Sequence, residues 1–250
     1  MGTQPNTRID AHFVAAGKYH DIDYARLELL KLLMEHPHIR TTVACDYSGL
    51  ERLDACRFLI TYTCDLMPTA EQAQQIRTWL EAGGKWLALH GTNSILEFTD
   101  EGLVDAPETR PDVMDMLGTQ FKAHPPIGSF VAEVVNSDHE FTRGIESFEI
   151  VDELYLSTTT GDIDILIQTT FEGEATGFVD ADWKKTTVPM VYTRKLGKGM
   201  VAYNALGHAR GHYDLPGMQD FYPHKEMCAW SYDVYYDLLR RGIAWAMRDE

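Results

Sequence analysis

The sequence has few cysteines and no paired cysteine motif. Four occur among 250 residues, and no two of them are spaced as C-x-x-C. Structural zinc knots and secreted disulfide scaffolds depend on such clusters. We therefore expect reduced thiols and a cytoplasmic protein. Cys64 follows a predicted strand and could be a reactive thiolate, although a small residue packed at a strand end is the simpler interpretation.

Long apolar runs and excess positive charge are also missing. No run approaches the roughly 20 residues of a membrane-spanning helix, and the opening MGTQPNTRID lacks the basic and apolar segments of a signal peptide. The chain has 22 Lys and Arg against 38 Asp and Glu, a formal net charge of −16. Such a charge repels phosphate backbones and anionic membranes. We expect neither nucleic acid nor a membrane as partner, and the acidic surface mainly serves solubility.

Several motifs of nucleotide-binding proteins and hydrolases are absent. The chain contains no G-x-x-x-x-G-K-[ST], no G-x-G-x-x-G after its first predicted strand and no G-x-S-x-G. The strand Lys85–Leu89 runs into His90-Gly91, where an elbow nucleophile would stand, yet neither Cys nor Ser occupies that place. These absences argue against phosphate-cradling loops and against an elbow nucleophile.

The first 91 residues have the periodicity of alternating strands and helices. Apolar residues at helical spacing predict helices over 23–35 and from a capping box at Thr69 to Gly83-Gly84. Short apolar runs predict four strands, at residues 9–16, 39–45, 57–61 and 85–89. The order βαββαβ is typical of a doubly wound, mainly parallel sheet.

The second half of the chain has weaker signals. Residues 92–128 contain four prolines, and only 111–117 has a helical pattern, so we expect a long, partly ordered insertion. Strand-like segments follow at 130–135, 148–151, 163–170, 189–193 and 200–204. A glycine-rich turn at 197–199 predicts a hairpin, and 229–247 reads as an amphipathic helix. Residues 8–248 are therefore predicted to form a single α/β domain.

Four histidines lie where strands end or within the insertion. They are His20, His90, His124 and His208. Ligands of doubly wound sheets bind at the carboxyl ends of strands, so we expect these side chains to converge. Each alone is more often an ordinary hydrogen-bonded histidine.

A carboxylate and a phenol add to this set. Glu153 and Tyr155 follow a predicted strand and lie two residues apart, which places them on one face of an extended segment. A polar strand edge is the plain alternative. Flat platforms for sugar rings could come from aromatic residues that otherwise serve packing, namely Tyr62, Trp86, Tyr155, Trp183 and Tyr213.

Two chemistries fit these residues. A divalent metal such as zinc could be held by His20, His90, His124 and His208, with Glu153 as a carboxylate ligand. No H-E-x-x-H motif supports a metal site locally. Metal-free acid–base catalysis is the alternative, with His90, Glu153, Tyr155 and His208 as the catalytic residues.

The motifs taken together resemble those of the trehalose-utilisation (ThuA-like) family of the class I glutamine amidotransferase-like superfamily. They span nearly the whole chain in family order: Gly17-x-x-His20-Asp21, Gly83-Gly84-Lys-Trp-Leu-Ala-Leu-His90-Gly91, Phe121-x-x-His124-Pro125, Asp138-His139, Asp152-Glu153-Leu154-Tyr155, Pro189-Met-Val-Tyr-Thr-Arg194, Gly197-Lys-Gly199 and Tyr203-Asn204-Ala-Leu-Gly207-His208. The resemblance implies a flavodoxin-like three-layer sandwich. It also implies a role in sugar metabolism, beside dehydrogenases that make 3-keto sugars. Amidotransferase relatives carry an elbow Cys where this chain has Gly91-Thr92, so no amidotransferase activity is expected.

We therefore predict an enzyme of the hydrolase, lyase or isomerase type that acts on a disaccharide or 3-keto sugar. Tyr19, Asp21, His139 and Asn204 are predicted to bind the substrate, although Asp21 and His139 could instead orient the histidines. The alternative is a non-catalytic sugar-binding or regulatory module. The expected partner is a small sugar, and a homodimer is the base-rate expectation.

Overall fold

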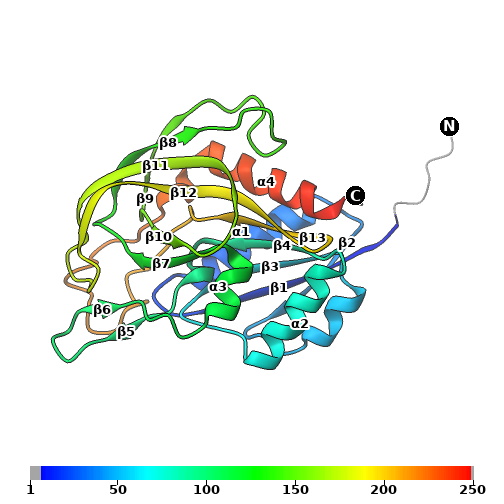
Figure 1. Cartoon of the computed structure of the whole chain (residues 1–250), viewed down its shortest axis with the longest axis horizontal. Helices are drawn as coiled ribbons and strands as arrows, with labels where there is room; N and C mark the ends of the chain where they lie inside the picture. Colours follow the sequence, from blue (N-terminus) through cyan, green and yellow to red (C-terminus); the bar gives the residue numbers. More distant parts are fainter. Residues whose placement is uncertain (1–6, 249–250) are drawn as a thin grey trace.

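A nine-stranded mixed sheet forms the centre of the molecule, with helices on both of its faces (Figure 1). The computed structural model describes residues 7–248. The strand order is β2-β1-β3-β4-β13-β12-β11-β8-β9. No helix within the described range has the length and apolar character needed to cross a membrane.

The first five strands in this order are parallel. They are β2 (Ile39–Ala44), β1 (Ile9–Gly17), β3 (Phe58–Cys64), β4 (Lys85–Leu89) and β13 (Gly199–Asn204). Every residue of β3 and β4 is buried, as is typical of central strands in a parallel sheet that is covered on both faces. This is the order of a flavodoxin-like sheet, the fold that the family resemblance implied.

Four helices complete the outer layers. α1 (Ile22–Met34) contacts α4 (Asp233–Met247), and α2 (Ala70–Glu81) contacts α3 (Pro111–Leu117), one pair on each face of the sheet (Figure 1). The capping box of α2 forms as predicted, since Thr69 Oγ1 accepts from Gln72 N at 3.2 Å. α4 begins later than expected, because a 3₁₀ turn, η3 (Cys228–Ser231), comes first.

The other half of the sheet is antiparallel. It consists of β12 (Asp182–Leu196), β11 (Asp164–Glu174), β8 (Gly128–Val134) and β9 (Phe148–Asp152). The predicted hairpin is confirmed, with Leu196 paired to Gly199. β12 begins seven residues before the predicted strand, because its first part is mostly exposed and leaves no apolar run.

The expectation of a partly ordered insertion at 92–128 was wrong. The segment forms η2 (His90–Asn93), β5 (Glu97–Phe98), β6 (Val104–Asp105), α3 and β7 (Thr119–Ala123). β5 pairs with β6, and β7 pairs with β10 (Leu156–Thr159). The short strands of this segment depend on tertiary contacts and show no periodicity in the sequence.

A further 3₁₀ turn, η1 (Leu50–Ala55), precedes β3 in the first half of the chain.

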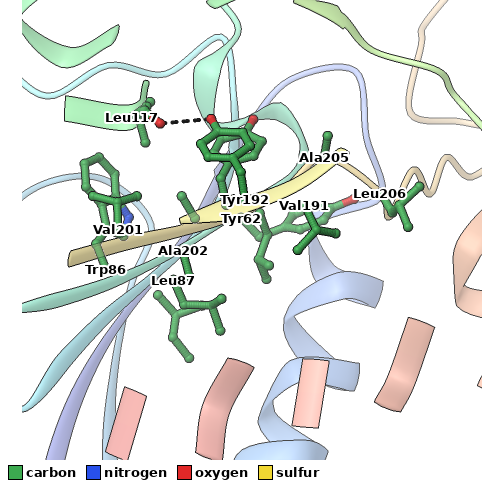
Figure 2. Close-up of a cluster of buried hydrophobic side chains, with 14 of the residues drawn as sticks. Tyr62, Trp86, Leu87, Leu117, Val191, Tyr192, Val201, Ala202, Ala205 and Leu206 are labelled. Carbon is green, nitrogen blue, oxygen red and sulfur yellow. Dashed lines mark hydrogen bonds between the residues drawn. The ribbon is translucent and has the colours of Figure 1, made fainter. Parts of the chain in front are cut away.

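Buried aromatic side chains fill the interior around the central strands (Figure 2). Trp86 Nε1 donates to Thr61 Oγ1 at 2.9 Å, and the hydroxyl of Tyr192 donates to the carbonyl of Leu117 at 2.9 Å. Tyr62 and Trp86 are 1% and 0% exposed, so they are core residues and not sugar platforms. Satisfying these polar atoms inside the core limits how the strands can shift.

Candidate metal centre

Four side chains from different strand ends meet in the interior. His20 follows β1, His90 follows β4, Glu153 follows β9, and His208 follows β13. One potential ligand atom from each lies within 4.8 Å of the others. All four residues are between 0% and 6% exposed. We call them the His3Glu cluster.

Glu153 reaches this cluster although β9 is the fourth strand beyond β13 in the sheet. Asp152 joins the two strand ends: its Oδ2 accepts from Gly207 N at 2.7 Å, and its Oδ1 accepts from His208 N at 3.1 Å and from Glu153 N at 2.9 Å. Three backbone donors thus surround one buried carboxylate. The contact brings the far end of the antiparallel half against the loop that follows β13.

The hydrogen bonds of His20 and His90 determine which ring nitrogens face the cluster. His90 Nδ1 lies 2.8 Å from the carbonyl of Ala205, and His20 Nδ1 lies 3.2 Å from the carbonyl of Lys18. Carbonyls only accept, so these contacts assign the proton to Nδ1 in both rings. Both Nε2 atoms then present lone pairs, and they are 2.9 Å apart. A shared cation is the natural neighbour of two such lone pairs.

His208 is oriented by a second carboxylate. Its Nε2 lies 2.9 Å from Glu226 Oε2, and its Nδ1 lies 3.2 Å from Glu153 Oε2. A carboxylate on the outer nitrogen of a histidine is the usual partner of a metal-binding imidazole. Burial alone would lower the pKa of His208, but Glu153 and Glu226 outweigh it and raise the pKa to about 9. Metal-free His208 therefore holds a proton that a metal ion would displace.

The surroundings also shift the pKa values of two other members of the cluster, His20 and Glu153. Burial, with the neighbouring His90 and His208 rings, lowers the pKa of His20 to about 3 against the opposing effect of Glu153. Burial alone would raise the pKa of Glu153, but His124, His208 and His20 outweigh it and hold that pKa well below its ordinary value. A neutral imidazole and an ionised carboxylate are the forms that bind metal ions.

The outer oxygen of Glu153 has its own partners. His124 Nε2 lies 3.3 Å from Oε1, and Arg210 Nη2 donates to the same oxygen at 3.4 Å. His124 thus lies beside the His3Glu cluster, which contains Glu153 and the other three of our candidate histidines. A role of His124 as a metal ligand stays a prediction. The His124 side chain is 25% exposed, which makes it a link between the cluster and solvent.

The elbow after β4 cannot hold a nucleophile at position 91. His90 has φ of 44°, a left-handed conformation that is rare outside glycine and is typical of functional sites. A Cβ atom on Gly91 would lie 2.7 Å from both Cys64 Cβ and the carbonyl of Thr63. Burial, aided by Glu153, raises the pKa of the Cys64 thiol, so the thiolate hypothesis finds no support.

Tyr155 and Tyr19 lie near the cluster in different ways. The Tyr155 ring is 4.4 Å from the ring of His90, and burial raises the pKa of its phenol well above the ordinary value. Tyr19 is half-buried, and its carbonyl accepts from Arg210 Nε at 2.9 Å. Tyr155 therefore stays protonated. Substrate binding by Tyr19 stays a prediction.

The other predicted binding residues have structural partners. Asp21 caps α1 by accepting from Tyr24 N at 3.0 Å, and Asn204 Oδ1 accepts from Leu206 N at 3.1 Å. His139 stacks on Phe141 within the β8–β9 connection. Asp21 and Asn204 shape the loops that carry His20 and His208. Substrate binding by Asp21, His139 and Asn204 stays a prediction.

Sequence reasoning missed three residues of the site. Asp152 stands in the sequence only as part of the Asp152-Glu153-Leu154-Tyr155 motif, and neither Arg210 nor Glu226 belongs to any of the motifs above. Arg210 Nη1 donates to Glu226 Oε2 at 3.0 Å, so Arg210 joins both carboxylates of the site. The spacing of His208 and Arg210, two residues apart after a strand, could have signalled the arginine. Glu226 lies in an irregular loop and left no signal.

The fold and site define a class: a flavodoxin-like α/β protein with a buried three-histidine, one-carboxylate cluster at its strand ends. A family model described as trehalose utilisation, ThuA, matches residues 13–223. The chain belongs to the ThuA family. None of the curated proteins searched matches it.

Solved structures agree on the fold. A ThuA-like protein from Parabacteroides merdae is 16% identical, with a TM-score of 0.69 over 96% of this chain and 90% of that one. A ThuA-like protein from Bacteroides uniformis is 15% identical, with a TM-score of 0.67 over 98% and 94%. A β-galactosidase from Rahnella sp. R3 is 12% identical, with a TM-score of 0.50 over 80% of this chain and 28% of that one. At these identities the likeness concerns the fold alone.

Proposed function

We propose that the protein is a metal-dependent enzyme of sugar metabolism that acts on a disaccharide or a 3-keto sugar. Membership of the trehalose utilisation family supports the sugar class. The main support for a bound metal is the position of the Nε2 atoms of His20 and His90, which lie 2.9 Å apart in a buried site beside Glu153 and His208. A zinc-like divalent ion suits these nitrogen and oxygen donors.

In the proposed enzyme the bound metal, the partners of the imidazoles and His124 have separate roles. A bound divalent ion would polarise a carbonyl oxygen or lower the pKa of a water molecule. The backbone carbonyls of Lys18 and Ala205 and the carboxylate of Glu226 keep the imidazoles in their ligand orientation. His124 is the partly exposed base next to Glu153, and we assign it proton transfer at a substrate oxygen.

One observation favours a second candidate, a sugar-binding or regulatory module without turnover. The four cluster residues are at most 6% exposed, so a substrate touches them only after a surrounding loop moves. Binding of a sugar without its conversion would favour the module. Conversion of a disaccharide or a 3-keto glucoside that depends on His124 would favour the enzyme.

The first test is the metal content of untagged protein by elemental analysis. We expect close to one divalent ion per chain in the wild type and its loss in His90→Ala. His139→Ala is the matched control, because this histidine contacts its own loop, and it should keep the metal. Wild-type protein that holds no metal, and takes up none when zinc, manganese or iron(II) is added, would rule out the metal-dependent enzyme.

A further inference from the structure

The surroundings of the buried cluster include an exposed aromatic ring that packing does not explain. Phe98, in the short strand β5, is 64% exposed. The β5–β6 hairpin and the segment after β13 lie at the same side of the molecule, on the left in Figure 1. A single exposed ring is common on protein surfaces, so its neighbours decide whether it belongs to a binding surface.

The hairpin is tied to the loop that carries His20. Asp65 Oδ2 accepts from Lys18 Nζ at 2.7 Å, and Asp65 Oδ1 accepts from Leu96 N at 3.0 Å. One carboxylate therefore fastens the start of the hairpin to the residue two positions before His20. The Phe98 ring then lies 6.4 Å from the ring of Tyr19, edge to face at 70°.

The same hairpin is tied to the His124 side of the cluster. Phe98 pairs with Val104 in β6, and Val104 N donates to the carbonyl of Gly177 at 2.8 Å. Phe178, the next residue, packs its ring 4.7 Å from the ring of His124. The hairpin thus contacts both the loop that carries His20 and the β11–β12 loop that packs on His124.

We propose that Phe98 and Tyr19 form an aromatic subsite that binds one ring of a neutral sugar beside the His3Glu cluster. Aromatic rings offer flat apolar faces to the C–H face of a pyranose, and ligand sites combine such faces with a few polar groups. The inference rests on the proposed function and names its substrate class. It also makes Phe98 a specificity-determining residue that no sequence motif indicates.

Charge favours a neutral sugar over a phosphorylated one. Lys18 already contacts Asp65, and Arg210 already contacts Glu153 and Glu226. The whole chain has a formal net charge of −16, which repels anions. A phosphate group at this subsite would have to displace a carboxylate from one of these cations.

The test is calorimetric titration of protein as purified with trehalose and with trehalose 6-phosphate. We expect Phe98→Ala to weaken trehalose binding about tenfold, while Phe98→Tyr binds as the wild type does. Leu103→Ala is the control, because Leu103 is an exposed apolar residue near the same hairpin. Metal content and the thermal midpoint should be equal in all variants.

The outcomes separate the subsite from the proposed function. Equal trehalose affinity in Phe98→Ala and wild type would overturn the subsite and leave the enzyme standing. Wild-type protein that holds metal but binds no trehalose, or binds the phosphorylated form more tightly, would overturn the neutral-sugar inference. Wild-type protein that holds no metal and takes up none when it is added would instead contradict the proposed function itself.

Discussion

The two halves of the sheet contribute to the site by different routes. The parallel half supplies His20, His90 and His208, each in the segment that follows a strand, and the carboxyl ends of these strands lie at the same edge. The antiparallel half supplies only Glu153, from the strand farthest along the order. The sheet topology alone brings the three histidines to one edge. The position of Glu153 depends on one buried carboxylate, Asp152, which connects the two halves.

Removing that connection should have the largest effect. Asp152→Ala leaves the buried N–H groups of Gly207 and His208 without an acceptor. We expect the free energy of unfolding to fall by about 3 to 5 kcal/mol, measured by urea denaturation. Glu149→Ala, an exposed carboxylate of the same strand, should change it by less than about 0.5 kcal/mol. A small loss in Asp152→Ala would show that the halves meet without this contact.

A variant of Glu226 tests whether His208, a histidine of the parallel half, needs a hydrogen-bond partner from outside the sheet to keep its orientation. Glu226→Gln removes the charged partner of His208 Nε2. Zinc affinity, measured by competition with a chromophoric chelator, should fall about 10- to 100-fold. Glu172→Gln, an exposed carboxylate on β11, serves as control. Unchanged affinity would mean that the backbone alone orients His208.

Gly91 tests how tightly β3 and the elbow after β4 pack in the parallel half. Gly91→Ala adds a Cβ that would meet Cys64 Cβ and the Thr63 carbonyl at 2.7 Å. We expect a loss of about 2 kcal/mol in the free energy of unfolding, measured by urea denaturation. Gly128→Ala is the matched glycine of the antiparallel half, because its Cβ would meet only the Pro126 carbonyl at 3.6 Å. Equal stability of the two variants would contradict the comparison.

His12 gives the smallest effect, a pH dependence inside the parallel half. The residue is 1% exposed, neither ring nitrogen has a hydrogen-bond partner, and burial with nearby Arg52 lowers its pKa below 6.5. Its contribution to stability is present above pH 6.5 and is lost as the pH falls below that value. His12→Leu should therefore lose about 1 kcal/mol less than the wild type between pH 7.5 and pH 5.5, measured by urea denaturation. Parallel losses would show that His12 takes up a proton in the folded protein as readily as in the unfolded chain.

The sequence predicted the parts of the fold that leave a local pattern. α2 and its capping box, the buried runs of β3 and β4, and the β12–β13 hairpin were all identified from spacing and turn residues. The positions of His20, His90 and His208 after strands followed from the same reasoning. The β5–β6 hairpin was missed because two-residue strands have no periodicity, and β12 was placed too short because its outer part is polar.

The sequence by itself determined the alternation of strands and helices, the family motifs and the candidate histidines, because each of these depends on residues close together in the chain. Only the tertiary structure decided that Glu153 lies within the His3Glu cluster and His124 beside it, that Asp152 links the halves, and that Phe98 lies beside Tyr19. These contacts join segments that are distant in sequence. They depend on how far the sheet curls and where loops return, and no local periodicity encodes either.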